Sequence, residues 1–216
     1  MFRILLAGLM CVMALPLAAK DPLPKKFSLD GQVLIYDTEA EALGDDAEMT
    51  VGDVDVLREM LNKNPDVTEL QLNSIGGSVY AGEEMAWIVI DFGLDTTVSG
   101  ECISACVDLF LAGNRRRMML GSKMGFHQRQ WSPKSVKNYY ESWSEDEGWE
   151  SPFDFASWIY EDTQSEIYEH LTYLTERGVD AGFAIETLRV GPGGEWYPSR
   201  LKLIAAGVLR ENPDGT

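Results

Sequence analysis

The sequence predicts a single α/β domain in which a mostly parallel sheet is flanked by helices. One observation is length: a chain of 216 residues, 45% of them hydrophobic, can bury one substantial core. The other is order, because strand-like runs alternate with helical spacings and are joined by short turns. Such alternation is typical of parallel sheets, whose sites form where strands end and helices begin.

The first residues have the pattern of a secretory signal peptide, predicted over residues 1–19. A basic start is followed by an apolar run and two small residues. Cleavage after Ala18 or Ala19 leaves residues 20–216 as one domain, in the periplasm or secreted. Because Leu17 is larger than the residue usual at that distance from a cleavage site, an uncleaved N-terminal membrane anchor is the alternative.

The first half of the mature chain alternates between strands and helices. In chain order we expect a hairpin over 27–36, a helix over 54–61, a strand over 67–72, a turn over 73–77 and a buried helix over 79–92. A second unit then has a strand over 96–98, a turn over 100–103 and an apolar helix over 104–112.

The second half is less regular. The basic run 115–117 reads as a solvated turn before a strand over 118–120. Residues 128–155 are rich in aromatic and acidic side chains and look like an insertion. It is either an arm that contacts a protein partner or another copy of the chain, or a lid whose aromatic side chains pack on the core. A helix over 160–174 and a last short helix and turn over 197–208 complete the chain.

The charge balance narrows the range of partners. A net charge of −17 makes nucleic acid a poor partner and argues against anionic membranes and phosphate-rich ligands such as coenzyme A. The chain has 3 cysteines and 2 histidines, and they form no cluster that suggests a metal site. We therefore expect neither a metal nor a cofactor.

Two cysteines would remain after the signal peptide is removed. Cys11 leaves with it, and Cys102 and Cys106 stay as an even pair in an oxidising compartment, where a disulfide is allowed. The alternative is two small buried thiols on one helical face, because four-residue spacing alone does not guarantee bridging geometry.

A few residues could carry chemistry. Gly76-Gly77 lies between a strand and a helix, where free backbone N–H groups can bind an oxyanion, although such pairs often serve only a tight turn. Ser104 stands at a second such junction. A serine there is ordinarily a helix cap, but the position also exposes its hydroxyl at the positive end of the helix dipole, beside the N–H of Ala105.

A serine nucleophile needs a base, and the chain offers two histidines. His170 lies beside the apolar stripe of its helix and is interpreted as a packed or surface residue. His127 ends a short strand one element after the serine helix, a reachable place for a base.

Four segments together resemble one family of serine peptidases. In chain order they read Asn73-Ser74-Ile75-Gly76-Gly77-Ser78-Val79, Gly100-Glu101-Cys102-Ile103-Ser104-Ala105-Cys106, Ala112-Gly113-Asn114-Arg115-Arg116 and Gly125-Phe126-His127. Their order and spacing are similar to those of Clp-protease-like peptidases of the crotonase superfamily, especially exported relatives, over roughly residues 27–209. The resemblance implies a fold of repeated β-β-α units, with a parallel sheet flanked by helices.

The resemblance also assigns roles. It makes Ser104 the nucleophile, His127 the base and the amides at Gly76, Gly77 and Ala105 the oxyanion hole.

The family's third catalytic residue is an acid just before the last short helix. Counting back from the glycine–valine pair that ends this helix gives Glu195, a glutamate where the family usually has aspartate, and Asp180 is the alternative. The chain departs from the family at Ile75, which replaces a usual proline. It departs again at 128–155, which covers the handle that joins subunits of Clp proteases into rings.

These observations predict an exported serine hydrolase, a peptidase that acts on peptides or proteins without ATP. An ATP-dependent unfoldase partner is not expected, because export removes access to ATP. One alternative is a non-catalytic periplasmic binding or scaffold protein that keeps the fold. Another is an enzyme acting on acyl thioesters, which the charge and the predicted location disfavour.

Overall fold

The computed structural model describes residues 26–40, 47–191 and 193–211. The strands are β1 (Phe27–Asp30), β2 (Val33–Asp37), β3 (Glu69–Ser74), β4 (Asp95–Ile103), β5 (Arg116–Met118) and β6 (Lys123–Gly125). The helices are α1 (Val51–Lys63), α2 (Val79–Phe92), α3 (Ala105–Leu111), α4 (Pro133–Trp143), α5 (Pro152–Glu176), α6 (Ala181–Thr187) and α7 (Arg200–Ala205). The predicted signal peptide and Cys11 lie outside the described residues, within which no helix is both long and apolar enough to cross a membrane.

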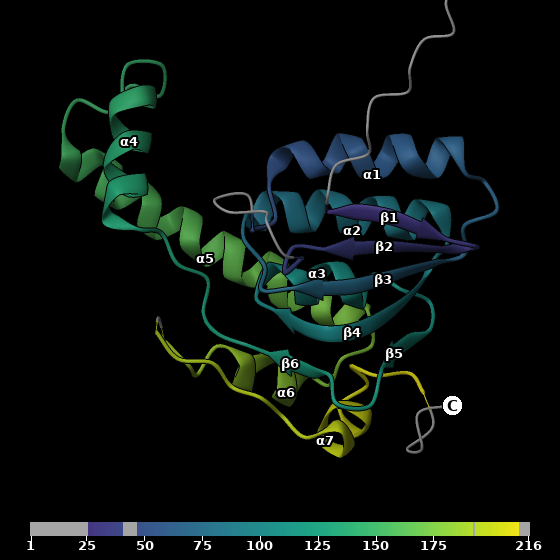
Figure 1. Ribbon diagram of the computed structural model, residues 1–216. Coiled ribbons are helices and arrows are strands. Elements are labelled where there is room, and N and C mark those ends of the chain that lie inside the picture. Colours follow the sequence, from purple (N-terminus) through teal and green to yellow (C-terminus); the bar gives the residue numbers. More distant parts are fainter. Residues whose placement is uncertain (1–25, 41–46, 192, 212–216) are drawn as a thin grey trace, which may run out of the picture.

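The six strands form one sheet in the order β1-β2-β3-β4-β5, with β6 also beside β4. β1 and β2 make an antiparallel hairpin, as predicted, and all other pairings are parallel. Helices α1, α2 and α3 pack one against the next along one face of the sheet (Figure 1). The α/β architecture with a mostly parallel sheet is therefore confirmed. A strand and a helix alternate from β2 to β5, and the first unit alone begins with two strands.

Strand β4 is longer than predicted, so the expected turn over 100–103 is wrong. Gly100 has the positive φ of 119° that suggests a turn, but here it sits where the register between β3 and β4 shifts. A Cβ at this position would lie 2.2 Å from Asn73 Oδ1. β4 then continues and pairs with β6, which carries the strand to the residue before Ser104.

The basic run is not a solvated turn, because Arg116 is fully buried. Its guanidinium donates hydrogen bonds to the carbonyl oxygens of Leu111, Arg177 and Gly207, at or just beyond the C-terminal ends of α3, α5 and α7. A cation is favourable at helix C-termini. Burial, together with the nearby charges of Arg210 and Arg177, lowers the pKa of Arg116 to about 9.

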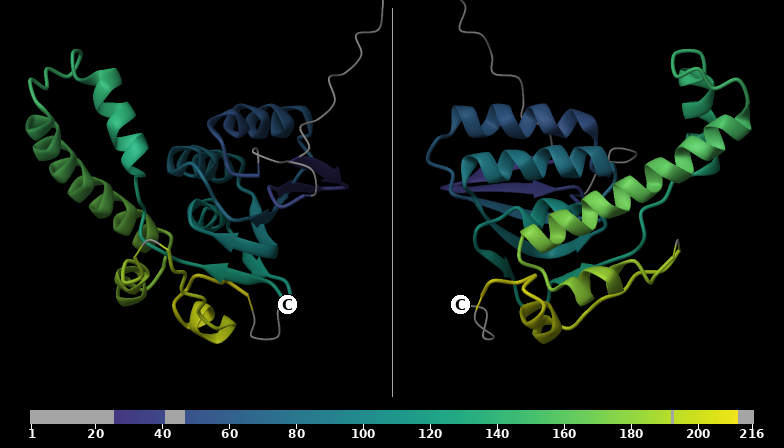
Figure 2. Two further views of the ribbon diagram at one scale, coloured as in Figure 1. Left: turned by 60° about the vertical axis from the view of Figure 1, so that its left-hand side comes forward. Right: turned by 180° about the vertical axis from the view of Figure 1, so that it is seen from behind.

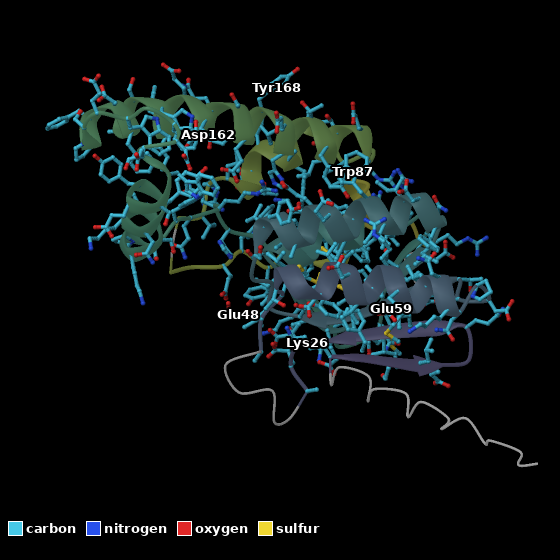
Figure 3. The ribbon with its side chains drawn as sticks, turned by 90° about the horizontal axis from the view of Figure 1, so that it is seen from above. Lys26, Glu48, Glu59, Trp87, Asp162 and Tyr168 are labelled. Atoms are coloured by element: carbon cyan, nitrogen blue, oxygen red, sulfur yellow. A yellow bond between two sulfur atoms is a disulfide. The ribbon has the colours of Figure 1, made fainter. Side chains whose placement is uncertain are left out.

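The predicted insertion forms α4 and the start of α5, which stand away from the sheet (Figure 2). Its aromatic rings pack mainly on one another: the Tyr139 ring centroid lies 5.2 Å from that of Trp131 and 5.7 Å from that of Trp158. Seen from above (Figure 3), α5 returns past α2, while Tyr168 points outward. The far end of α5 joins the main core through Leu174. The arm formed by α4 and α5 is thus held together by its own aromatic cluster.

Candidate active site

Ser104 has an unusual backbone conformation. It links β4 to α3 with φ 57° and ψ −129°, and it is the one non-glycine among the described residues with a positive φ. It occupies the N-cap position of α3, but its side chain makes no capping hydrogen bond, unlike that of an ordinary serine cap. A strained serine on a sharp strand-to-helix turn, whose hydroxyl has no partner within the described part of the chain, has the geometry of a nucleophile elbow.

Glycines from α2 and the turn before it pack directly against this turn. A Cβ on Gly76 would lie 2.9 Å from Ser104 Cβ and 3.1 Å from Ala105 N, and a Cβ on Gly82 would lie 2.8 Å from Ala105 O. No real side chain tolerates such contacts without movement. The structure therefore brings the predicted Gly76 and Ser104 together and requires glycine for the approach.

The predicted oxyanion donors differ in what they bind. The Gly76 N–H donates to Ser74 Oγ at 3.1 Å. Among the described residues, neither Gly77 N–H nor Ala105 N–H donates a hydrogen bond to a backbone or side-chain acceptor. Ala105 is the first residue of α3, where an N–H has no partner within the helix.

A disulfide spans the serine. The structure joins Cys102, near the end of β4, to Cys106 on α3, with a Cα–Cα distance of 5.3 Å. Both cysteines are fully buried. The bond closes a short loop that contains Ser104 and limits how far that turn can relax.

His127 lines the same small cavity as Ser104, about 30 Å³ in volume. Its Nδ1 lies 2.7 Å from the carbonyl oxygen of Gln128. Because a carbonyl only accepts hydrogen bonds, Nδ1 carries a hydrogen, and in the neutral ring the free lone pair is then on Nε2. This tautomer is the one a general base needs. The Ser104 N–H also donates to Gly125 O at 3.2 Å, which ties the serine turn to the segment that carries His127.

The two candidate acids lie in different places. Phe126 and Trp196 exchange both backbone hydrogen bonds, at 3.0 and 2.9 Å, so the backbones of His127 and Glu195 run next to each other. The exposed Glu195 carboxylate accepts a hydrogen bond from Tyr197 Oη at 2.8 Å. Partial burial and this bond raise the pKa of Tyr197 to about 12.

Asp180 is committed elsewhere. Its carboxylate caps α6 by accepting from the Phe183 N–H at 2.9 Å, and it lines a cavity that contains neither Ser104 nor His127. Glu195 is therefore the one of the two acids whose backbone adjoins the proposed base.

Three further ionisable residues line the Ser104 cavity and were not singled out as functional from the sequence: Asp108, Arg129 and His170. The interpretation of His170 as merely packed or surface-exposed is thus incomplete, because the ring faces the cavity with 14% of its side chain exposed. The sequence does point to Asp108, because it is the single charged residue of the otherwise apolar helix α3. A buried carboxylate needs a partner.

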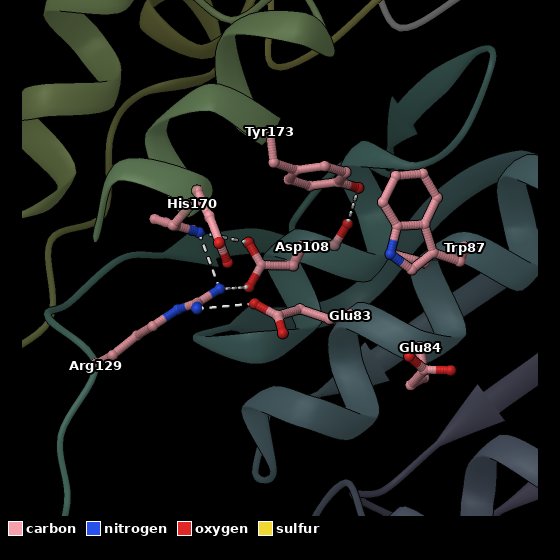
Figure 4. Close-up of a pocket in the computed structure, with 9 residues that line it drawn as sticks. Glu83, Glu84, Trp87, Asp108, Arg129, His170 and Tyr173 are labelled. Carbon is pink, nitrogen blue, oxygen red and sulfur yellow. Dashed lines mark hydrogen bonds and ion pairs between the residues drawn. The ribbon is translucent and has the colours of Figure 1, made fainter. Parts of the chain in front are cut away.

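That partner is Arg129, whose Nη2 donates to Asp108 Oδ2 and to His170 Nδ1, each at 3.0 Å (Figure 4). His170 Nδ1 thus lies beside a guanidinium, which only donates, and also 3.4 Å from Asp108 Oδ1, which only accepts. Burial lowers the pKa of His170, and the charge of Arg129 adds to this against the opposing effect of Asp108. Nδ1 of His170 is therefore engaged by the Arg129–Asp108 ion pair, which leaves His127 as the better candidate base for Ser104.

Two larger cavities adjoin the one at Ser104. One of about 180 Å³ is lined by Glu83, Trp87 and Tyr173, and another of about 610 Å³ by the arm residues Trp131 and Tyr160. Both include Arg129 and His170 in their walls. Space for a substrate therefore exists beside the serine. Within the part of the chain that the structure describes, no group of three His, Cys, Asp or Glu side chains could hold a metal ion.

Comparison with known proteins supports the fold. No protein-family model matches the chain, and no curated protein matches its sequence. Among solved structures, the chain is similar to a mutant of ClpP1 from Listeria monocytogenes, with a TM-score of 0.50 and 16% sequence identity. The similarity covers 78% of this chain and 90% of that one. At this identity the likeness shows a ClpP-like fold and no more.

Proposed function

We propose that this chain is an exported serine hydrolase of the crotonase superfamily that cleaves peptide bonds without ATP. The observation that carries the proposal is Ser104: a serine held at positive φ, without a side-chain capping bond, in one cavity with a histidine whose Nδ1 contacts the Gln128 carbonyl. The ClpP-like fold is consistent with this assignment.

In the proposed reaction, His127 Nε2 takes the proton from Ser104 Oγ as this oxygen attacks the substrate carbonyl. The amides of Gly77 and Ala105, which have no other acceptor among the described residues, stabilise the tetrahedral oxyanion. Gly76, whose N–H is bound to Ser74, provides the close approach between the two turns. The imidazolium then protonates the leaving amine, and water completes the turnover.

We further propose that the Gln128 carbonyl orients His127, because it holds the ring nitrogen that a carboxylate holds in a triad. Glu195 would have to leave Tyr197 to take this role. Glu195→Gln should therefore keep its rate of labelling by an active-site probe within about twofold of wild type. A triad acid would instead show a loss on the order of 10⁴-fold in turnover, and such a loss would make Glu195 the third member.

The test of the nucleophile is covalent labelling by a fluorophosphonate. Wild type should be labelled, and Ser104→Ala should not. Ser132→Ala is the matched control, because Ser132 caps α4 on the exposed arm and should be dispensable for labelling. Equal labelling of wild type and Ser104→Ala, or labelling of neither, would overturn the proposal.

Substrate class and location need separate measurements. Cleavage of an unstructured peptide by wild type and not by Ser104→Ala, in the absence of ATP, would support a peptidase. Hydrolysis of an acyl thioester alone would point to the other crotonase chemistry. Export predicts that the mature protein, isolated from the periplasm, begins after Ala18 or Ala19, and an intact N-terminus there would indicate an anchor.

A non-catalytic binding role rests on a separate observation. The arm exposes large apolar side chains, with Phe153, Tyr160 and Tyr168 between 69% and 84% accessible, which suits contact with a protein partner or a second copy of the chain. Function that survives Ser104→Ala and is lost when these three residues are replaced by serine would favour this role over hydrolysis.

A further inference from the structure

We propose that Arg129 is a positioning residue that sets the separation between Ser104 and His127 by tying the histidine segment to α3 through Asp108. The inference rests on the proposed function of Ser104 and His127. Arg129 itself is not assigned a chemical step.

The ion pair between Arg129 and Asp108 lies close in the sequence to both His127 and Ser104. Arg129 lies two residues after His127, and Asp108 lies four residues after Ser104, one helical turn along the same side of α3. A bond between Arg129 and Asp108 therefore links the segment of the base to the helix that begins at the nucleophile. Together with the Ser104 N–H bond to Gly125 O, it connects the same two segments at a second point.

The guanidinium is well placed to hold a fixed position. Its side chain is 18% exposed, that of Asp108 is 5% exposed, and the two lie 3.0 Å apart. Besides the bonds from Nη2, Nη1 pairs with Glu83 of α2 at 2.8 Å and donates to Glu166 of α5 at 3.1 Å. Three helices thus hold one side chain.

The residue type fits this role. Arg129 meets four partners with the two terminal nitrogens of a planar group, each of which carries two hydrogens. A lysine has one nitrogen on a flexible stem and cannot reach four directions at once. The Gln128 N–H donates to Val190 O at 2.8 Å, but from Arg129 to Trp131 the backbone N–H groups donate no hydrogen bond among the described residues. Beyond Gln128, the Arg129 side chain therefore supplies the polar contacts that link this stretch to the helices.

The test measures the rate constant of fluorophosphonate labelling, per folded molecule, in the mature chain. Displacement of a catalytic group by about 1 Å can lower a rate about 100-fold, and we expect a loss of this order for Arg129→Gln, with partial recovery in Arg129→Lys. Arg117→Gln is the matched control, because Arg117 makes a similar ion pair to Glu69 at the other end of the sheet. It should label within about twofold of wild type.

A double-variant comparison separates positioning from stability. If Arg129 acts through Asp108, then Asp108→Asn lowers the labelling rate to a similar degree and the double variant is no slower than either single one. The inference would be overturned if the two single effects on the labelling rate multiply in the double variant. It would also be overturned if Arg129→Gln is labelled at the wild-type rate. An unlabelled wild type would instead refute the nucleophile itself.

An independent readout is an NMR titration that follows the ring protons of the chain's two histidines. Removing the Arg129 donor and charge should raise the pKa of His170 in folded Arg129→Gln, because Arg129 now holds it down. An unchanged pKa of His170 would mean that the contact is absent in solution and would overturn the inference without reference to activity.

Discussion

Replacing Ser104 by glycine and by alanine measures the backbone strain at the proposed nucleophile. Both variants lose the hydroxyl, so they differ only in the Cβ. The backbone angles φ 57° and ψ −129° lie in a region that favours glycine, so a residue with a Cβ is strained there. Strain of this kind amounts to about 1–3 kcal/mol. Ser104→Gly should therefore be the more stable of the two proteins.

Glycine and alanine also differ for reasons unrelated to strain. Glycine is more flexible in the unfolded chain and is better tolerated at an N-cap. Ser132 supplies a matched pair of variants, because it is an N-cap with an ordinary φ of −67°. We subtract the glycine–alanine difference in the free energy of unfolding at Ser132 from the same difference at Ser104. This removes most of the unfolded-chain and N-cap contributions and leaves the strain.

The assay is urea unfolding of the oxidised proteins, followed by tryptophan fluorescence and extrapolated to water. We expect the glycine–alanine gap in the free energy of unfolding to be larger at Ser104 than at Ser132 by about 1–3 kcal/mol. Equal gaps would refute the reasoning, because they would mean that Ser104 is unstrained in solution. The proposal of a preset nucleophile turn would then lose its main support.

Three other predictions concern the same site. Gly76→Ala should abolish labelling of the serine, because its Cβ would meet Ser104. The control is Gly121→Ala, at a similar positive φ with open space around it, which should lose only stability. Equal labelling of the two variants would contradict this prediction. Replacing both Cys102 and Cys106 by alanine should lower the free energy of unfolding by about 2 kcal/mol, the chain-entropy value for so short a loop. The same double replacement should slow labelling of Ser104. An unchanged midpoint of urea unfolding would argue against the disulfide. Because the pKa of His170 is lowered, its neutral form favours the folded state above about pH 6.5, and this contribution is lost as the pH falls through the lowered pKa. Between about pH 7.5 and 5.5 the wild type should thus lose more free energy of unfolding than His170→Gln does, and parallel losses would contradict it.

The sequence was sufficient for most of the fold because the signals are local. The hairpin of β1 and β2 and the helix α2 follow from alternation and apolar spacing over a few residues. It failed where a long-range contact overrode a local signal. Gly100 has the backbone of a turn residue, yet the pairing of β4 with β6 keeps it within a strand. Arg116 looks solvated in the sequence, yet its guanidinium is bound to three carbonyl oxygens in the interior.

The candidate site was predicted only in part for the same reason. Ser104 and the glycines upstream stand at strand-to-helix junctions, which composition and spacing reveal. The contacts of Arg129 join residues 21 and 41 positions apart in the sequence, and no pattern in a single chain specifies them. The lone carboxylate of Asp108 in an apolar helix was the one available sign that a cation must come from elsewhere.

The positive φ of Ser104 persists because several independent contacts fix it. Strained residues survive only where their surroundings leave no relaxed alternative. Here the disulfide closes a short loop around the turn, Gly76 packs directly against it, and the bond to Gly125 O anchors the Ser104 N–H. None of these contacts satisfies the Ser104 hydroxyl. A turn held this firmly, with no capping bond from the Ser104 side chain, is the arrangement that the proposed reaction at Ser104 would need.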